Sequence, residues 1–239
     1  MKKVSCITAK PNKYYKGIRI MADTDLHDQL TAIIDAFLPK GSRILDFGAG
    51  EGALSQRLYD KGYQVYSVDA DQERFRARTE FERLDFDNSA DISSFVRKHC
   101  ESFDLVLGIE VIEHLENPWQ FMRNLGDLVK SGGWILISTP NITSWFSRVS
   151  FFFKGRFHQF DDADRDYGHI NPISEDELKL ICGRSGLLIE KIVPGGWLPR
   201  LWLNLSPKGL LFNLFGFLGS FFMKGAWDGW CLIALIKKE

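Results

Sequence analysis

The chain has 239 residues, of which 45% are hydrophobic and 26% charged, values typical of one globular domain with embellishments. Its 31 acidic and 30 basic residues give a formal net charge of −1, which argues against a surface built to bind nucleic acid. The four cysteines lie far apart without a C-x-x-C pair, so we expect reduced thiols rather than a disulfide framework or a zinc site. The N-terminus lacks the apolar segment of a signal peptide, and no apolar run is long enough to span a bilayer, so we expect a cytoplasmic protein.

We predict that residues 1–40 form an N-terminal arm followed by one helix. The arm has no regular apolar pattern, and it is equally compatible with a cover over a substrate pocket and with a loose terminus. From Leu26 to Phe37 apolar residues recur at helical spacing, and Asp25 or Thr24 is placed to cap this helix.

The most informative stretch follows and runs from Arg43 to Gly52. A short apolar run ends at Asp46, and glycines then occupy every second position, with Gly48 and Gly50 before Gly52. A helix-forming segment comes next, so we predict a strand, a tight glycine turn and a helix. Glycine permits a sharp turn that brings backbone N–H groups against a ligand, and the helix N-terminus adds positive potential.

The glycine spacing distinguishes two classes of nucleotide-binding protein. It is G-x-G-x-G, whereas the dinucleotide fingerprint is G-x-G-x-x-G. The acidic residue before the first glycine would repel a pyrophosphate and would suit a ligand with an ammonium group. The stretch 45–52 resembles the first motif of the class I S-adenosylmethionine (SAM)-dependent methyltransferases, and the resemblance covers most of the chain from about Leu26 onward. It implies SAM as the cofactor, with contacts from Asp46, Gly48, Ala49, Gly50 and Gly52.

A second acidic residue, Asp69, ends the next predicted strand, at 63–68. It follows the glycine loop by close to the ~20 residues expected of a carboxylate that binds ribose hydroxyls. The alternative is that Asp69 caps a helix from Gln72 onward, because aspartate is a favoured N-cap. We predict ribose binding, since Asp69 lies at the carboxyl end of a strand within the same unit.

Two further cofactor positions depend more on the resemblance. It implies that Asp85, after a weak strand at 81–84, accepts a hydrogen bond from the adenine amino group. It also implies that Phe86 offers a backbone N–H and an apolar wall, although the residues alone form only an acidic turn. Ile109 ends an almost wholly apolar strand at 103–109, which is typical of a strand buried on both faces of a parallel sheet, and we expect it to contact the cofactor.

The candidate catalytic residues follow that strand in the segment Glu110-Val111-Ile112-Glu113-His114. On a helical turn its polar residues would share one side, and His114 is suited to deprotonate a hydroxyl near neutral pH. We therefore predict His114 and Glu110 as catalytic. The segment resembles O-methyltransferase branches that include ubiquinone-biosynthesis enzymes and enzymes that methylate the 3′ ends of small RNAs.

That resemblance leaves a metal site open. In those branches matching Glu and His residues and a later His, here His169, hold a divalent metal. Carboxylates with imidazoles suit Mg²⁺ or Mn²⁺. The same pattern also occurs in methyltransferases without a metal, where it shapes the pocket wall. We assign no metal ligand and keep both interpretations of Glu110, Glu113, His114 and His169.

The predicted elements give an α/β fold in which seven strands alternate with helices. The resemblance implies a Rossmann-like, mostly parallel sheet with helices on both faces and an antiparallel seventh strand. We assign 41–239 to one SAM-binding domain with insertions at 141–172 and 195–229. The remaining predicted strands are 134–138, 187–192 and 230–236, and the remaining predicted helices are 53–59, 91–99, 119–129 and 177–185.

Both insertions are rich in aromatic residues. The first would act as a lid over the carboxyl ends of the strands. In the second, apolar residues between 210 and 222 fall on one helical face. This face is compatible with a cover over the sheet, with an interfacial helix that contacts a membrane through 197–224, or with a substrate tunnel or homodimer surface.

We predict a SAM-dependent methyltransferase that acts on a small molecule. The favoured acceptor is a hydroxyl oxygen of an apolar or lipid-linked substrate, such as a quinone precursor or a lipid-carried sugar. A non-catalytic SAM-fold or membrane-associated scaffold protein is the first alternative. A nicotinamide-dependent oxidoreductase is the second, and Asp46 and the glycine spacing weigh against it.

Overall fold

The computed structural model describes residues 13–22, 25–196, 198 and 206–239. The Thr24 cap and the part of the second insertion at 199–205 lie outside these residues. The strands are β1 (Tyr14–Tyr15), β2 (Ile18–Arg19), β3 (Arg43–Phe47), β4 (Gln64–Asp69), β5 (Glu80–Arg83), β6 (Phe103–Ile109), β7 (Val129–Pro140), β8 (Leu187–Gly195) and β9 (Cys231–Lys238). The helices are α1 (Leu26–Phe37), α2 (Ala53–Asp60), α3 (Ser89–Lys98), α4 (Pro118–Leu128), α5 (Trp145–Lys154), α6 (Asp162–Asp166), α7 (Glu175–Arg184) and α8 (Pro207–Ser220), with a 3₁₀ turn, η1, over Ile112–His114.

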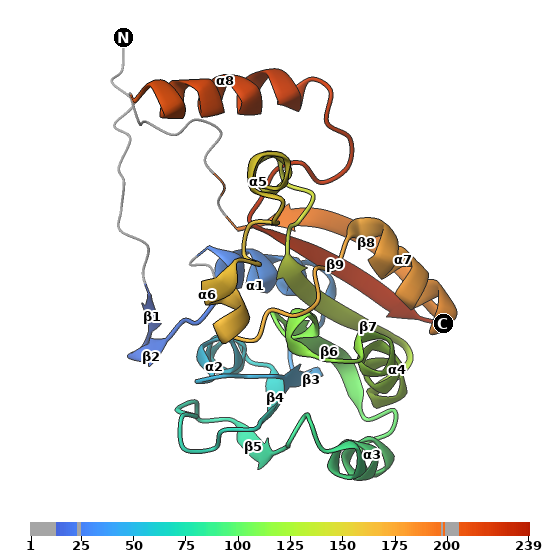
Figure 1. The fold of residues 1–239 in the computed structure, drawn as a ribbon. Coiled ribbons are helices and arrows are strands. Elements are labelled where there is room, and N and C mark those ends of the chain that lie inside the picture. The colour runs from blue at the N-terminus through green and yellow to red at the C-terminus, as the bar shows by residue number, and fades with distance from the viewer. Residues whose placement is uncertain (1–12, 23–24, 197, 199–205) are drawn as a thin grey trace.

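Seven strands form a central sheet in the order β5-β4-β3-β6-β7-β9-β8 (Figure 1). The neighbours from β5 to β7 run parallel, whereas β9 runs antiparallel to both β7 and β8. This confirms the predicted Rossmann-like sheet with an antiparallel last strand. The strand order reverses at β3, which pairs with β4 on one side and with β6 on the other. In open α/β sheets, ligands bind at such a switch point, outside the carboxyl ends of the strands.

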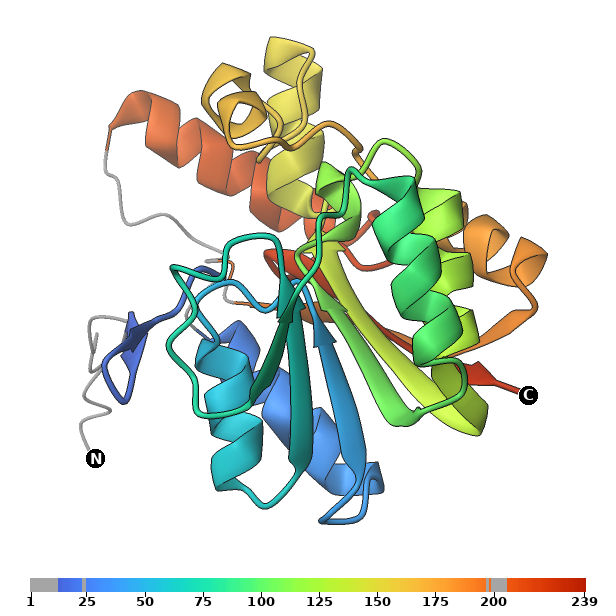
Figure 2. The ribbon, with the colours of Figure 1, turned by 90° about the horizontal axis from the view of Figure 1, so that it is seen from below.

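Helices cover both faces of the sheet (Figure 2). Leu105 and Leu107 of β6 belong to an apolar cluster with Leu30 of α1. Val106, which lies between them, belongs to a second cluster that contains Met122 of α4. Because successive side chains of a strand point to opposite faces, β6 is apolar on both sides, as its sequence predicts.

The helix termini follow the capping rules in most but not all places. The Ser174 hydroxyl accepts a hydrogen bond from the N–H of Glu177 at 3.1 Å, so the predicted cap of α7 is confirmed. Asn117 caps α4 in the same way. The prediction that Asp25 caps α1 is wrong, because its side chain makes no capping hydrogen bond.

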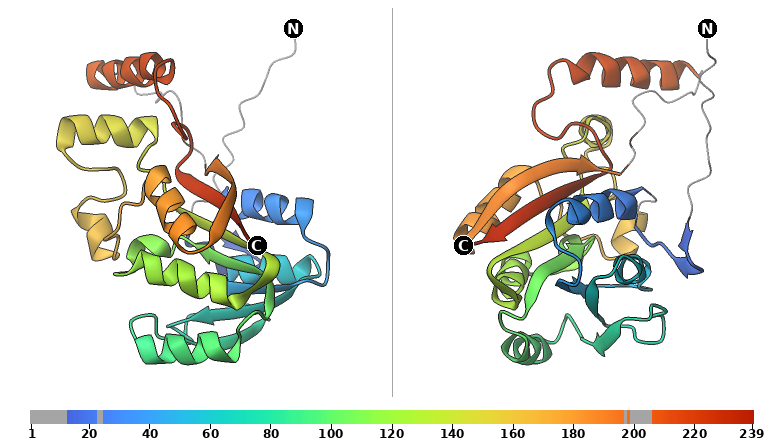
Figure 3. Two further views of the ribbon diagram at one scale, coloured as in Figure 1. Left: turned by 90° about the vertical axis from the view of Figure 1, so that its right-hand side faces the viewer. Right: turned by 180° about the vertical axis from the view of Figure 1, so that it is seen from behind.

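The described part of the N-terminal arm is an ordered hairpin of β1 and β2 rather than a loose terminus. The Tyr15 hydroxyl donates to the Asp60 carboxylate at 2.9 Å, and the Arg57 guanidinium lies 4.5 Å from the centre of the Tyr15 ring. Lys16 forms an ion pair with Asp60 at 2.7 Å. These contacts attach the hairpin to α2 (Figure 3).

The two insertions meet beyond the carboxyl edge of the sheet. In α8, Gly216 lies so close to buried Trp145 of α5 that a Cβ there would come within 2.7 Å of the indole ring. The predicted apolar face of α8 does not cover the sheet, since its described side chains are 49% to 85% exposed. Among the described residues, no helix has both the length and the apolarity needed to cross a bilayer.

Candidate active site

A cavity of about 870 Å³ opens where β3, β4 and β6 end. Its walls come from the glycine loop, the end of β4, the segment around η1, the N-terminal hairpin and the first insertion, 141–172, which we call the lid segment. The predicted residues that line it are Asp46, Gly48, Ala49, Gly50, Asp69, Phe86, Ile109, Glu110 and His114. Gly52 and Asp85 are not among its lining residues.

The glycine loop needs its glycines for backbone conformation and close packing. Gly48 has a φ of 89°, and a Cβ there would lie 2.5 Å from Cγ2 of Val111. Gly52 has a φ of 88° at the N-cap of α2, where a Cβ would lie 2.7 Å from the Phe75 ring. Side chains at these positions would be strained and would push the loop away from its neighbours.

The loop N–H groups do not point into the cavity as expected. The N–H groups of Gly48 and Ala49 both donate to the Val68 carbonyl, at 2.9 Å and 3.0 Å. The Gly50 N–H donates to the Asp69 carboxylate at 2.8 Å. The expectation of free N–H donors is therefore wrong for these three residues. The backbone of the loop instead forms part of the cavity wall.

Asp69 holds the loop and also lines the cavity. Its second oxygen accepts from the Asp71 N–H at 3.1 Å, and no helix begins between Asp69 and Phe75. The alternative role as a helix cap is therefore wrong. A carboxylate oxygen has more than one lone pair, so Asp69 retains acceptor capacity toward the cavity.

Asp46 is a buried acid at the end of β3. It is 2% exposed, and the Ser55 hydroxyl donates to its carboxylate at 2.5 Å. Burial raises the pKa of Asp46 to about 6, and the charge of Asp69 adds to this rise. At neutral pH Asp46 still carries most of its negative charge, which can face a cation in the cavity.

Of the two residues predicted to contact the adenine, only Phe86 lines the cavity. Phe86 lines the cavity and stacks on Phe47, with ring centroids 4.8 Å apart and an interplanar angle of 20°. The Asp85 carboxylate accepts from the Asp87 N–H at 3.0 Å and lies outside the lining. Its role toward an adenine amino group stays a prediction.

Glu110 adopts a conformation that the sequence did not reveal. Its φ of 54° lies in the left-handed region, so it does not continue into η1, and its side chain does not share a helical face with Glu113. The Ser138 hydroxyl donates to one Glu110 oxygen at 2.7 Å, and the Cys231 thiol contacts the other at 3.4 Å. Glu110 is thereby tied to β7 and β9 at the cavity wall.

A second group of polar side chains forms where the lid segment contacts η1. Glu113, His114 and His169 offer potential ligand atoms that all lie within 4.8 Å of one another. The Glu113 backbone carbonyl accepts from the N–H groups of Ile170 and Asn171, at 3.0 Å and 2.9 Å, which fixes the lid segment against η1. The structure thus brings together three of the four residues considered for a metal, without Glu110.

The Glu113 carboxylate is exceptional among the charged groups. It is fully buried, and neither of its oxygens makes a contact of hydrogen-bond geometry among the described residues, although the nearby Thr139 hydroxyl acts to lower its pKa. Burial, with the neighbouring charge of Glu110, raises the pKa of Glu113 well above its ordinary value. A buried carboxylate without a partner is costly, so this position is suited to a cation.

The two histidines beside it are oriented by backbone groups and by each other. His169 Nδ1 lies 2.7 Å from the Gln159 carbonyl. Since a carbonyl only accepts, Nδ1 carries the proton, and Nε2 of a neutral His169 keeps a free lone pair. Burial and the nearby His169 lower the pKa of His114, and its ring lies 4.8 Å from the His169 ring.

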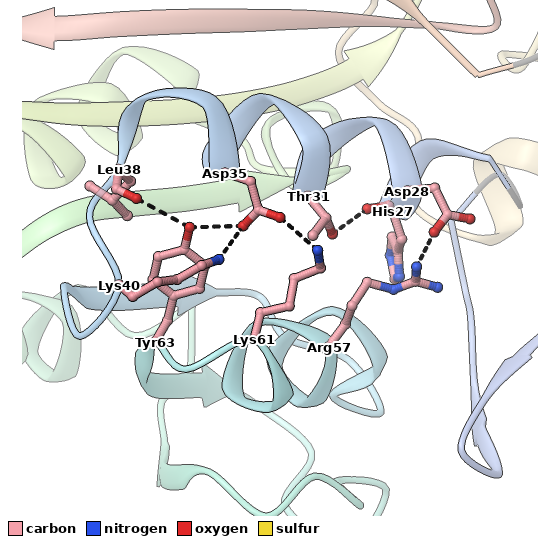
Figure 4. A network of polar contacts seen from close by, with 9 residues as sticks. All are labelled: His27, Asp28, Thr31, Asp35, Leu38, Lys40, Arg57, Lys61 and Tyr63. Carbon is pink, nitrogen blue, oxygen red and sulfur yellow. Dashed lines mark hydrogen bonds and ion pairs between the residues drawn. The ribbon is translucent and has the colours of Figure 1, made fainter.

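Several lining residues escaped the sequence analysis, notably His27 at the start of α1. Burial lowers the pKa of His27 to about 4, with a further contribution from the Arg57 cation. Arg57 is itself paired with Asp28 (Figure 4). His27 gave no signal because its cavity position depends on how α1 packs on α2. The other unpredicted lining residues include Arg19, Met21, Arg74, Gln159, Tyr167 and Trp230.

Comparison with known proteins agrees with this fold. Residues 22–192 match the family described as "Methyltransferase domain". The chain therefore belongs to that family, that is, to the class I SAM-dependent methyltransferases, whose cofactor is SAM.

Individual relatives are more distant. The chain is 35% identical over 104 residues to a ubiquinone biosynthesis O-methyltransferase from Ruegeria pomeroyi, a match that covers 42% of each chain. It is 32% identical over 108 residues to the protein of that name from Caulobacter vibrioides, covering 44% of this chain and 43% of the relative. The matches thus span less than half the length of these curated relatives. The fold is similar to that of a SAM-dependent methyltransferase from Archaeoglobus fulgidus, with a TM-score of 0.60 and 18% identity over 89% of this chain and 94% of that one.

Proposed function

We propose that the chain transfers the methyl group of SAM to a hydroxyl oxygen of a small apolar or lipid-linked acceptor. The observation that carries the proposal is that one cavity is lined by two chemically distinct groups of residues. The glycine loop, Asp46 and Asp69 form the first group, and Glu110, His114 and His169 form the second. The names of the relatives from Ruegeria and Caulobacter support an oxygen acceptor.

The first group of residues fits the parts of SAM. Asp46 would face the cationic amino-acid end, Asp69 would accept from the ribose hydroxyls, and Phe86 would form a wall for the adenine. Gly48 and Gly50 would let the cofactor approach the main chain. Because the methyl group of SAM is bound to a positively charged sulfur, it is already electrophilic, and the protein must align an acceptor with the S–CH₃ bond.

The second group of residues would take up the proton of the acceptor. When bound, SAM would supply an electrophilic methyl group on its sulfonium sulfur, and His114 would take up the proton of the acceptor hydroxyl. His114 lines the cavity, and its lowered pKa keeps it neutral and able to accept that proton at neutral pH. Glu110 would accept a hydrogen bond from the acceptor and hold it in line.

A second candidate mechanism uses a divalent cation held by Glu113, His114 and His169. The orphaned Glu113 carboxylate and the free Nε2 of His169 fit a cation such as Mg²⁺ or Mn²⁺. A bound cation would lower the pKa of the acceptor hydroxyl. In that case His114 would be a ligand and would not be the base, so the two mechanisms exclude each other at this residue.

The apolar acceptor suggests where the chain would work. The proposal includes peripheral contact of the 197–224 segment with the inner face of a membrane, and a quinone precursor or a lipid-carried sugar as the acceptor. The exposed apolar residues of α8 support such contact. A homodimer through the same residues is the alternative use of this surface.

The test combines binding with product analysis. Calorimetry should show SAM binding and much weaker binding of NADH. Incubation with methyl-labelled SAM and a lysate separated into lipid, sugar and RNA fractions should place the label in the lipid fraction. Label in the sugar or RNA fraction alone would contradict the acceptor class, and well-folded protein that fails to bind SAM would favour a scaffold role.

A further inference from the structure

His27, the second residue of α1, is a buried polar side chain on the wall of the cavity. It is 6% exposed, and it lines the cavity together with Met21, Ala22 and Leu54. Its two ring nitrogens have different surroundings. Nδ1 is enclosed and makes no hydrogen bond among the described residues, whereas Nε2 is not enclosed in this way. Nε2 is therefore the nitrogen that a ligand in the cavity can reach.

Arg57 of α2 lies on the enclosed side of this histidine. Its Nε is also buried without a hydrogen-bond partner among the described residues, while its guanidinium is paired with Asp28. Figure 4 shows the side chains of His27 and Arg57 pointing toward one another from α1 and α2. The Nε–H of an arginine can only donate, and Nδ1 of a neutral imidazole accepts only when the proton is on Nε2. Arg57 thus favours the tautomer whose N–H can donate into the cavity.

The charge state of His27 limits what it can do there. Burial and the Arg57 cation lower its pKa to about 4, so the imidazole is neutral at neutral pH. A base of that strength is poorly matched to the proton of a hydroxyl group. With its proton on Nε2, the ring also has no lone pair to offer a cation in the cavity. His27 is therefore suited to donate one hydrogen bond to an acceptor group of a ligand.

One acceptor group of SAM still lacks a partner. The amino-acid end of SAM carries a carboxylate on the same carbon atom as its ammonium group, and the proposed function gives a partner, Asp46, to the ammonium group alone. Asp46 and His27 both border α2, since Asp46 accepts from Ser55 and His27 faces Arg57. Leu54, next to Ser55, lines the cavity. A carboxylate only accepts hydrogen bonds, so it matches the N–H of His27 as the ammonium group matches Asp46.

Two cationic side chains of the cavity wall are competing partners for this carboxylate. Arg19 of β2 and Arg74 line the cavity, but both are exposed. Arg74 also lies 3.7 Å from the Asp71 carboxylate. Water competes for the N–H groups of exposed side chains, whereas a hydrogen bond from a buried donor to a charged acceptor is strengthened by its surroundings. Burial therefore favours His27.

We propose that His27 selects SAM by donating a hydrogen bond from Nε2 to the carboxylate of the amino-acid end of the cofactor. A ligand with the same adenosine, sulfonium and ammonium groups but no carboxylate would lose this contact. The inference rests on the proposed function, because it names the partner of one further group of SAM. It gives the first turn of α1 a direct part in cofactor specificity.

The test is calorimetry of the full chain with SAM and with decarboxylated SAM, which keeps the sulfonium and ammonium groups. The wild type should bind SAM roughly ten- to a hundredfold more tightly. His27→Phe keeps a ring and removes the N–H, so its affinity for SAM should fall close to that for decarboxylated SAM, which should itself stay unchanged. His27→Gln retains a side-chain N–H and should restore part of the difference.

A matched control is His99→Phe, at a histidine that is 7% exposed and lies outside the cavity lining. Its two dissociation constants should equal those of the wild type. Wild-type preference for SAM in His27→Phe would overturn the proposal, as would loss of both ligands in His27→Phe and His27→Gln. Loss of the preference in Arg19→Gln alone would assign the carboxylate to the hairpin and would also overturn it.

These outcomes separate the role of His27 from the proposed function. A wild type that does not bind SAM would refute both. A wild type that binds SAM, with an unchanged preference in His27→Phe, would refute the role of His27 alone.

Discussion

The Asp69 carboxylate accepts a hydrogen bond from the backbone N–H of Gly50, 2.8 Å away. This contact joins the end of β4 to the glycine loop that follows β3. The residue proposed to bind the ribose thus also fixes the loop that would face the cofactor. Its two roles predict that cofactor affinity depends strongly on this one side chain.

Asp69→Ala should weaken SAM binding by roughly ten- to a hundredfold, because it removes a charged acceptor from both the ligand and the loop. Calorimetry measures the dissociation constant. Asp87→Ala, at an exposed turn after Asp85, is the control and should leave it unchanged. Wild-type affinity in Asp69→Ala would remove the ribose assignment.

Gly48→Ala should destabilise the loop, since its Cβ would lie 2.5 Å from Val111 at a φ of 89°. We expect a loss of about 1–3 kcal/mol in the free energy of unfolding and weaker SAM binding. Adding Val111→Ala removes the clashing methyl group and should restore part of both. Gly183→Ala in α7, where a Cβ meets nothing within 4 Å, should be neutral or slightly stabilising. Denaturant unfolding of the four proteins checks this prediction.

Asp46 should make SAM affinity depend on pH. Its pKa of about 6 in the folded protein means that the carboxylate gains a proton as the pH falls through that value, and the attraction for a cationic ligand is then lost. Affinity should therefore rise from acidic to neutral pH, and Asp46→Asn should remove this dependence.

The pH dependence of folding stability that Asp46 causes is opposite to that of SAM affinity. Because folding raises the pKa of Asp46, its ionised form opposes folding, and that cost appears as the pH rises through about 6. Without cofactor, Asp46→Asn should therefore not lower the melting temperature at neutral pH. A fall in the melting temperature of this variant would show that the ionised group is stabilised by contacts other than the Ser55 hydroxyl.

His114→Ala should cut turnover by about 10²- to 10⁴-fold if His114 is the base, while the dissociation constant of SAM stays close to that of the wild type. Turnover is measured with the acceptor fraction that takes up the label. A matched substitution at another half-buried histidine, His158→Ala, should reduce turnover far less, since His158 does not line the cavity. Equal losses in the two variants would contradict a role in chemistry.

The cation proposal predicts a thermal shift that is independent of activity. Mn²⁺ or Mg²⁺ should raise the melting temperature of the wild type, and EDTA should reverse the rise. Glu113→Gln removes the buried charge, so it should not respond to the cation and should melt no lower than the metal-free wild type. If neither cation shifts the wild type and EDTA leaves turnover intact, the cation mechanism is wrong.

The sequence allowed the sheet and the glycine loop that lines the cavity to be predicted because their signals are local. The segment from Arg43 to Asp60 contains an apolar strand, obligatory glycines and a helix within one continuous stretch. The apolar run of β6 likewise predicts a strand buried on both faces. Local periodicity is enough where each element matches its own pattern.

The conformation of Glu110 and the cavity position of His27 could not be predicted in the same way. Glu110 takes a left-handed conformation that its residue type does not favour, held by Ser138 and Cys231 from distant strands. His27 reaches the cavity through the packing of α1 on α2. The exposed face of α8 has the same apolar pattern as a core helix, and its orientation follows from the contact of Gly216 with Trp145. Each of these depends on tertiary contacts between residues far apart in the chain.

Gly195 and Cys231 face each other across the β8–β9 pair. The segment between them therefore leaves the sheet and returns to it at the same point. Antiparallel neighbours can be joined by a short turn, and the sheet therefore does not need this excursion to close. Over evolutionary time such a segment can be lengthened, shortened or exchanged with little disturbance to the strands. Changes in this segment would alter where the protein binds in the cell and leave the cofactor chemistry of the domain unchanged.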